Sequence, residues 1–134
     1  MTLREVLHAH VPTLTPDSTV RDAVDKLDIY QFPGLILLNT DLFPIAVVTE
    51  GDICRAAQQH DSLAALRDEP VIQFATPDPT TASPSMEISD ALHLMFSQGI
   101  TILPIVDMGV FCGLVLRVDL MHAMFLDARP VQTG

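Results

Sequence analysis

Basic residues are scarce in this sequence of 134 residues: seven Lys and Arg stand against 17 Asp and Glu, for a formal net charge of −10. A chain of this charge repels phosphate backbones and anionic membrane surfaces. Long apolar runs are also missing, because stretches such as residues 32–38 and 100–106 contain proline and fall short of the ~20 residues that span a bilayer. We therefore expect neither a nucleic-acid polymer nor a membrane as a partner.

Cysteine is equally scarce. Cys54 and Cys112 are the only two in the sequence, too few for the disulfide scaffold of a secreted chain, and their apolar neighbours predict reduced, buried thiols. Glu5 lies where a secretory signal would continue into an apolar core, so we expect a cytoplasmic protein. With 49% apolar residues, the chain can bury one compact core without support from metals or disulfides.

An internal repeat organises the sequence. The apolar i, i+3, i+4, i+7 pattern of residues 20–27 recurs 68 positions later in residues 88–95, and both segments are predicted to be amphipathic helices. Farther along the chain the offset is 67, as between Asp52 and Asp119. The change of one residue is expected in the turn around residues 39–41, because turns tolerate insertions.

Each half of the repeat is predicted to fold as strand, helix, strand, strand, helix, which is an α+β arrangement. The predicted strands are residues 12–14, 35–38 and 45–48 in the first half and residues 80–82, 103–106 and 112–116 in the second. Because one half alone leaves its sheet uncovered, the two halves should pack about a pseudo-twofold axis and share one core. The expected boundaries are residues 1–68 for repeat 1, residues 69–127 for repeat 2 with a connector at 69–85, and residues 128–134 for a C-terminal tail.

Two segments of the repeat carry a resemblance to a known family. Residues 44–53 read PIAVVTEGDI, and residues 103–107 read LPIVD. Doubled at this spacing, these motifs resemble the cystathionine-β-synthase domain, or CBS domain, and the match covers most of residues 1–127. The resemblance implies a pair of such domains, a Bateman module, which acts as a regulatory sensor rather than as an enzyme and commonly binds adenosine-containing ligands.

The resemblance also implies protein partners. Members of the family often form flat dimers through the helices of the two repeats, so we expect a homodimer. The high apolar content agrees with this expectation, because it exceeds what the core of a small monomer needs. The pair is expected to signal to an effector protein that is another polypeptide.

The signature Thr49-x-x-Asp52 is the strongest candidate site. A carboxylate at a helix start can accept hydrogen bonds from both ribose hydroxyls of a nucleotide, while the Thr49 hydroxyl and free backbone N–H groups can meet a phosphate. The same spacing also forms a capping box that merely satisfies the helix N-terminus, and one carboxylate can do both. The resemblance implies that the wall for the base comes from the other repeat. The ligand-binding residues that we expect are Val47, Thr49, Asp52, Thr80, Ile100, Thr101, Arg117 and Asp119.

Repeat 2 departs from this signature, because Leu116 stands where repeat 1 has Thr49. Asp119 could still bind a ribose and Arg117 could supply charge to a phosphate, although a helix cap and a surface cation explain these two residues more simply. If only one site is used, we expect the site that contains Thr49 and Asp52.

This interpretation requires no cofactor, and the scarcity of cations near the motifs favours an AMP-like ligand over ATP. The alternative function is a ligand-free module for dimerisation or protein interaction. An enzyme is the least favoured class, because the sequence presents no nucleophile with a base and an orienting partner. His8 and His10 also lack further ligands at spacings that complete a metal site.

Overall fold

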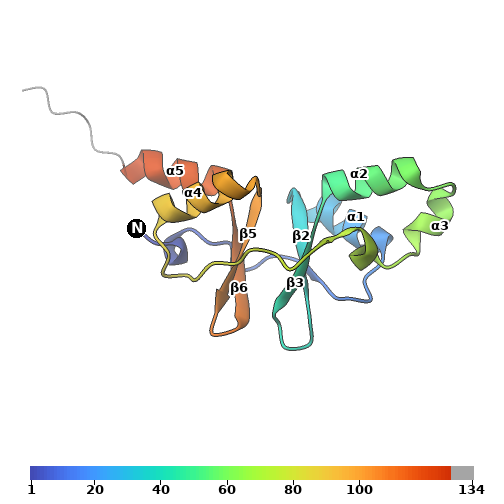
Figure 1. The fold of residues 1–134 in the computed structure, drawn as a ribbon, viewed down its shortest axis with the longest axis horizontal. Helices are drawn as coiled ribbons and strands as arrows, with labels where there is room; N and C mark the ends of the chain where they lie inside the picture. Colours follow the sequence, from blue (N-terminus) through green and yellow to red (C-terminus); the bar gives the residue numbers. More distant parts are fainter. Residues whose placement is uncertain (128–134) are drawn as a thin grey trace, which may run out of the picture.

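The structure, a computed structural model, describes residues 1–127, and the predicted C-terminal tail at residues 128–134 lies outside the described residues. In chain order the elements are η1 (Leu3–Glu5), β1 (Thr13–Leu14), α1 (Val20–Tyr30), β2 (Gly34–Leu38), β3 (Pro44–Thr49), α2 (Glu50–Gln59), α3 (Leu63–Arg67), η2 (Val71–Phe74), β4 (Thr76–Pro77), α4 (Ile88–Gln98), β5 (Ile102–Asp107), β6 (Val110–Leu116) and α5 (Arg117–Asp127), where η marks a short 3-10 helix. Helices and strands follow each other in both halves (Figure 1), so the α+β class is confirmed.

The internal repeat is visible in the helices. α1 and α4 are both 11 residues long and end at a residue with a left-handed backbone, Gln31 with φ 59° and Gly99 with φ 66°. The buried stripe consists of Val20, Ala23 and Leu27 on α1 and of Ile88, Ala91 and Met95 on α4. Five residues, 39–43, separate the paired residues Leu38 and Pro44, and four residues, 107–110, separate the equivalent pair Val106 and Phe111. The change of offset therefore lies in the turn, as predicted.

The two sheets are unequal. Repeat 1 forms a four-stranded sheet in the order β1-β2-β3-β4, with β1 parallel to β2 and the other pairs antiparallel. Repeat 2 has a two-stranded sheet of β5 and β6, and the strand predicted near residues 80–82 is reduced to one parallel bridge between Ala82 and Ile105. Pro79 and Pro84 flank this segment and lack the N–H donors of a longer ladder, so that prediction is wrong in extent.

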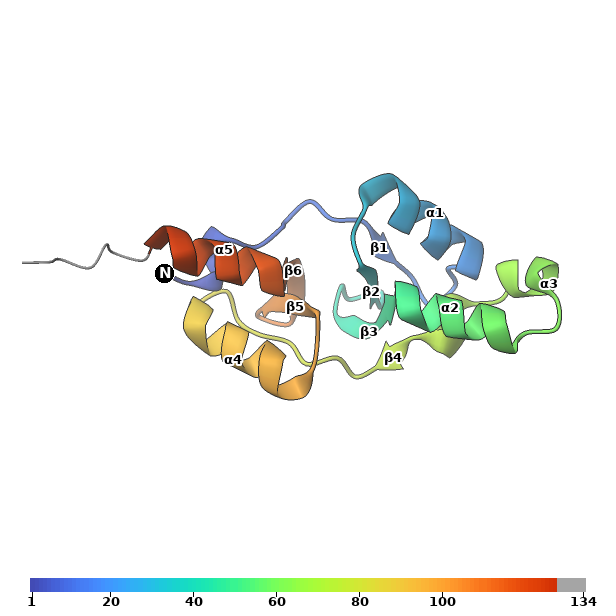
Figure 2. The same ribbon diagram turned by 90° about the horizontal axis from the view of Figure 1, so that it is seen from above.

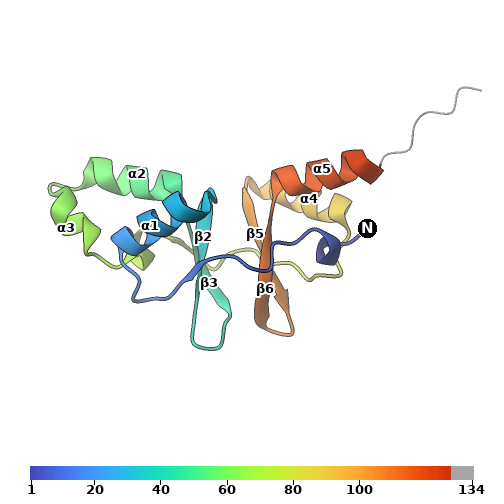
Figure 3. The same cartoon turned by 180° about the vertical axis from the view of Figure 1, so that it is seen from behind.

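Each half of the molecule is completed by the first segment of the other repeat. β4 lies in the connector at the start of repeat 2, yet it pairs with β3 and places Thr76 opposite Val47. Conversely, His8 lies at the start of repeat 1, yet it forms an antiparallel bridge with Leu114 of β6, and Leu3 is fully buried in the core of repeat 2. Figures 1 and 3 show the two crossing segments from opposite sides. The two halves are therefore interlocked.

The core consists of three clusters rather than the single core expected. One cluster lies in each half, and a third joins the sheets through buried Ile36 and Leu38 of β2, Ile102 of β5 and Leu114 of β6. Figure 1 shows the helices on one side of the molecule and the two hairpins projecting from the other. Seen from above, α1 and α4 lie on opposite sides of α2 and α5 (Figure 2), as the pseudo-twofold relation of the repeats predicts.

Gly34 allows the two sheets to approach each other, and it supplies a test of this contact. A Cβ atom at Gly34 would lie 2.6 Å from Cδ1 of Ile102 and 2.7 Å from the backbone oxygen of Val48. We expect Gly34→Ala to lower the free energy of unfolding by about 1–3 kcal/mol, the usual cost of overpacking, as measured by urea denaturation. Gly51→Ala is the control, because its nearest contact would be an ordinary 3.4 Å. Equal stabilities of the two variants would contradict the tight contact at Gly34.

Candidate ligand-binding cleft

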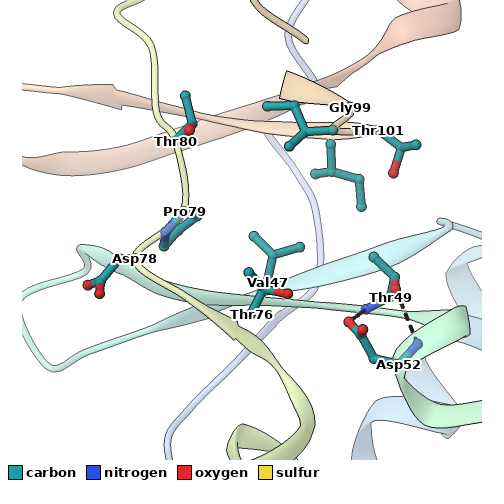
Figure 4. A pocket seen from close by; sticks show the side chains of 11 residues that line it. Val47, Thr49, Asp52, Thr76, Asp78, Pro79, Thr80, Gly99 and Thr101 are labelled. Carbon is teal, nitrogen blue, oxygen red and sulfur yellow. Dashed lines mark hydrogen bonds between the residues drawn. The ribbon is translucent and has the colours of Figure 1, made fainter. Parts of the chain in front are cut away.

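A cleft of about 270 Å³ lies between the two repeats. Three segments form it: the end of β3 with the start of α2, the connector from β4 to residue 80, and the link from α4 to β5 (Figure 4). Its lining residues are Val47, Thr49, Asp52, Thr76, Asp78, Pro79, Thr80, Gly99, Ile100, Thr101 and Ile102. Residues far apart in sequence therefore face one another across a single opening.

The strand β3 delivers Thr49 to the cleft. Val48 is fully buried in the core of repeat 1, while Val47 packs against the cluster that joins the sheets, because successive side chains of a strand point to opposite faces. Thr49 continues from this strand and is the N-cap of α2. The cleft therefore opens where the strand ends and the helix begins.

Thr49 and Asp52 form the capping box that their spacing allowed. The backbone N–H of Thr49 donates to Oδ2 of Asp52 at 2.9 Å, and the backbone N–H of Asp52 donates to Oγ1 of Thr49 at 3.3 Å. The second carboxylate oxygen, Oδ1, accepts a hydrogen bond from Nη2 of Arg55. The Asp52 side chain is 11% exposed and that of Arg55 is 65% exposed, so a solvated partner covers a nearly buried carboxylate.

The opposite wall comes from repeat 2. Gly99 ends α4 with its N–H donating to the Phe96 oxygen at 3.2 Å, and the Ile100 N–H donates to the Met95 oxygen at 3.0 Å. This left-handed turn directs the link to β5 along the cleft. Oγ1 of Thr80 donates to Oε1 of Gln98 at 2.5 Å, and this contact attaches the connector to the end of α4.

The cleft brings together six of the eight residues expected from the sequence. These six are Val47, Thr49, Asp52, Thr80, Ile100 and Thr101. Arg117 and Asp119 lie elsewhere: Arg117 lines a hollow between α4 and α5 beside Phe96 and Met121, and Asp119 contacts His8. The interpretation of Arg117 and Asp119 as a helix start with a surface cation therefore fits their surroundings better.

Thr76 and Asp78 also line the cleft, although the sequence interpretation did not include them. They reach it because β4 pairs with β3, and a strand of two residues within a proline-rich connector leaves no periodic signal. The repeat was the one signal that could have predicted this position. Thr76 and His8 are equivalent residues of the two repeats, and each pairs with a strand of the other half.

The cleft is acidic. Asp52 lies at one end and Asp78 at the other (Figure 4), and none of the eleven lining residues is Lys or Arg. Arg55 reaches the cleft only through its contact with Asp52. A ligand with several negative charges would therefore meet little compensating charge here.

The Cys112 thiol is not an activated nucleophile. Burial raises the pKa of the Cys112 thiol, with a further contribution from Asp107, and Sγ of Cys112 donates to the Ile105 oxygen at 3.4 Å. A thiol with a raised pKa is largely protonated near neutral pH and reacts slowly. Cys54 is exposed on α2, which corrects the expectation of a buried residue, because its side chain lies on the outer face of that helix.

The described residues contain neither a metal-binding cluster nor a membrane-spanning helix. Within residues 1–127, no group of three His, Cys, Asp or Glu side chains is placed to hold a metal ion. No helix in the same range is both long enough and apolar enough to cross a membrane.

The family model for the CBS domain matches the chain twice, over residues 3–59 and 71–126. The chain belongs to the CBS domain family. The resemblance carried by the two sequence motifs is thereby confirmed, and the two matches correspond to the two repeats of the fold. CBS domain pairs are, as a class, regulatory modules.

Known relatives of this CBS pair differ in length. An uncharacterised 17.7 kDa protein of Acidianus ambivalens is 28% identical over 131 residues, which cover 97% of this chain and 76% of that protein. Inosine-5'-monophosphate dehydrogenase of Methanocaldococcus jannaschii is 29% identical over 103 residues, which cover 77% of this chain but only 19% of the enzyme.

Among solved structures, CBSX2 in complex with AMP matches the CBS pair with a TM-score of 0.80. The match covers 93% of this chain and 96% of the CBSX2 chain at 21% sequence identity. At this identity the likeness shows the fold alone.

Proposed function

We propose that this CBS pair is a non-catalytic regulatory module that binds an adenine nucleotide or a related adenosyl ligand in the cleft and signals its occupancy to a partner. The observation that carries the proposal is the single cleft formed by Thr49 and Asp52 of one repeat and residues 99–102 of the other. A ligand that contacts both walls favours the arrangement of repeats in which the walls are correctly spaced. Such differential affinity for two arrangements transmits a signal.

The proposed roles follow from the contacts of each side chain. Oδ2 of Asp52 stays bonded to the helix cap, while Oδ1 exchanges Arg55 for the hydroxyls of a ribose. The guanidinium of Arg55 is then available to a 5'-phosphate near the start of α2. Ile100 and Val47 offer apolar contact to the base, and the hydroxyls of Thr80 and Thr101 lie where they can bind polar atoms of the ligand.

Three further points belong to the proposal. The solved complex of CBSX2 with AMP supports an adenosyl ligand on this fold, and no other cofactor is required. The acidic lining favours an AMP-like ligand over ATP. The effector is a separate protein, and the cytoplasmic location expected from the sequence stays a prediction.

The role of Asp52 can be tested by thermal unfolding with adenosine, AMP, ADP, ATP and S-adenosylmethionine. A ligand at 100 times its dissociation constant stabilises a protein by about 2.7 kcal/mol, so a clear rise in Tm is expected with at least one of them. Asp52→Ala should abolish that rise, because it removes the acceptor for the ribose.

Asp22→Ala is the matched control. Asp22 forms the same capping box with Thr19 at the start of α1, outside the cleft, and the backbone N–H of Thr19 lowers the pKa of the Asp22 carboxyl. Both variants lose the N3 carboxylate of a capping box, but only Asp52→Ala should lose the ligand. An unchanged ligand response in Asp52→Ala would contradict the proposed site. If no ligand raises the Tm of the wild type, the ligand-free interaction module becomes the better function.

The charge of the cleft predicts a ranking of ligands. Isothermal titration calorimetry at low salt should give AMP a dissociation constant about tenfold below that of ATP, a difference of about 1.4 kcal/mol, because the additional phosphates meet Asp52 and Asp78. Raising the ionic strength should narrow the difference, since salt screens exposed charges. Tighter binding of ATP at every salt concentration would contradict this electrostatic account.

The helices of repeat 2 support the proposed homodimer. Phe96 on α4 is 76% exposed and Phe125 on α5 is 80% exposed, with Val118, Met121 and Leu126 also exposed on α5. Such a group of large apolar side chains is typical of a surface that is covered in an assembly.

Light scattering at micromolar concentration should therefore give a mass twice the 14.6 kDa of one chain. Phe96→Asp combined with Phe125→Asp should give a monomer, because carboxylates without cationic partners are costly to bury in an apolar interface. Met108→Asp is the control, since Met108 is 97% exposed in the turn between β5 and β6, away from these helices. A monomeric wild type would refute the dimer.

A further inference from the structure

The position equivalent to the cleft can be identified in the other half of the molecule. Thr76 lies opposite Val47 of β3, and His8 lies opposite Leu114 of β6, so His8 is the counterpart of Thr76. By the same repeat, Phe32 corresponds to Ile100, Leu116 to Thr49 and Asp119 to Asp52. We call His8, Phe32, Leu116 and Asp119 the counterpart site.

In the counterpart site, the imidazole of His8 binds the carboxylate. Nε2 of His8 lies 2.8 Å from Oδ2 of Asp119, and the same oxygen accepts the backbone N–H of Leu116 at 2.9 Å. The ring of His8 also meets that of Phe32 edge to face, with centroids 5.6 Å apart and an interplanar angle of 79°. One side chain thus bonds one oxygen of the carboxylate, Oδ2, and contacts the neighbouring apolar wall.

The backbone holds His8 in this place. The N–H of His8 donates to the Leu114 oxygen at 2.8 Å, and the N–H of Leu114 donates to the His8 oxygen at 3.1 Å. Gly113 permits this close approach, because a Cβ atom there would lie 2.5 Å from the His8 oxygen. Arg55, which covers Asp52 in the cleft, comes from the same helix as that carboxylate and reaches it with the end of a long side chain. His8 instead comes from a separate segment of the chain, whose backbone is paired with β6.

Apolar side chains also border the counterpart site. Phe32, Leu116 and Val11 pack against the buried cluster that joins the two sheets. Each of the three counterparts of cleft residues is larger or less polar than its equivalent: His8 for Thr76, Phe32 for Ile100, and Leu116 for Thr49. All three differences leave less polar space for a ligand in the counterpart site than in the cleft.

We infer that His8 is an internal occupant of the counterpart site and that the chain therefore binds one ligand, at Asp52, rather than two. The imidazole of His8 bonds the capping oxygen of Asp119 and lies against the carboxylate where a ribose would have to approach it, and Phe32 fills the position of the base. The number of ligands rests on the proposed function, whereas the contact of His8 with Asp119 does not.

A double-mutant cycle tests the contact without any ligand. His8→Ala and Asp119→Ala should each lower the urea midpoint of unfolding, and the double variant should lose less than the sum of the two shifts, because residues in direct contact are not additive. His60→Ala is the control in combination with Asp119→Ala, since His60 contacts Glu69 instead, and these shifts should add. Additive shifts for His8 and Asp119 would overturn the inference.

The number of sites is tested by calorimetric titration with AMP. The wild type should bind one AMP per chain, and Asp52→Ala should bind none. Two AMP molecules per wild-type chain, or binding retained in Asp52→Ala, would overturn the inference. If the wild type binds no AMP, the ligand role fails on its own, and the double-mutant cycle decides whether His8 occupies the counterpart site.

A variant with the cleft residues transplanted provides the converse test. His8→Thr, Phe32→Ile and Leu116→Thr together give the counterpart site the residues of the cleft. This variant, with its fold checked by circular dichroism, should bind a second AMP. A folded variant that still binds one AMP would overturn the assignment of these three side chains as the occupants.

Discussion

The arrangement of the whole molecule depends on the exchange of edge segments between its halves. β4 completes the sheet of repeat 1 although it leads into repeat 2, and Leu3 and His8 complete repeat 2 although they lead into repeat 1. Both crossings are held by backbone hydrogen bonds and by buried apolar side chains, so neither half can separate without exposing part of its own core. We therefore expect the two repeats to unfold as one cooperative unit.

The cleft is a direct result of this exchange. After β4 pairs with β3, the connector continues past Asp78 and is attached to the end of α4 by the contact of Thr80 with Gln98. The same segment therefore contacts the strand that presents Thr49 and the link that presents Ile100. A change in the spacing of the walls must move this segment, and through it the edge of the repeat 1 sheet. A ligand bound in the proposed cleft would therefore contact a segment that both repeats share.

Local patterns predicted most of the elements but not the contacts between distant segments. The helical periodicity gave α1 and α4, the apolar runs gave the two hairpins, and the spacing of Thr49 and Asp52 gave the capping box. β4 and the bridge of His8 escaped prediction, because pairings of one or two residues have no periodicity. The expectation for Asp119 followed the repeat alone, whereas its surroundings are set by a residue 111 positions away. Only the fold brings such a pair together.

The two carboxylates show how one motif acquires two roles. Asp52 is covered by the solvated end of an arginine on its own helix, which a ligand can displace by moving one side chain. Asp119 is covered by a ring that also contacts Phe32 and whose backbone is paired with Leu114 of β6. The two carboxylates therefore have different partners in the two repeats. If the proposed cleft binds a ligand, we therefore expect the response to involve α2, the connector and the link that follows α4 rather than the contact of His8 with Asp119.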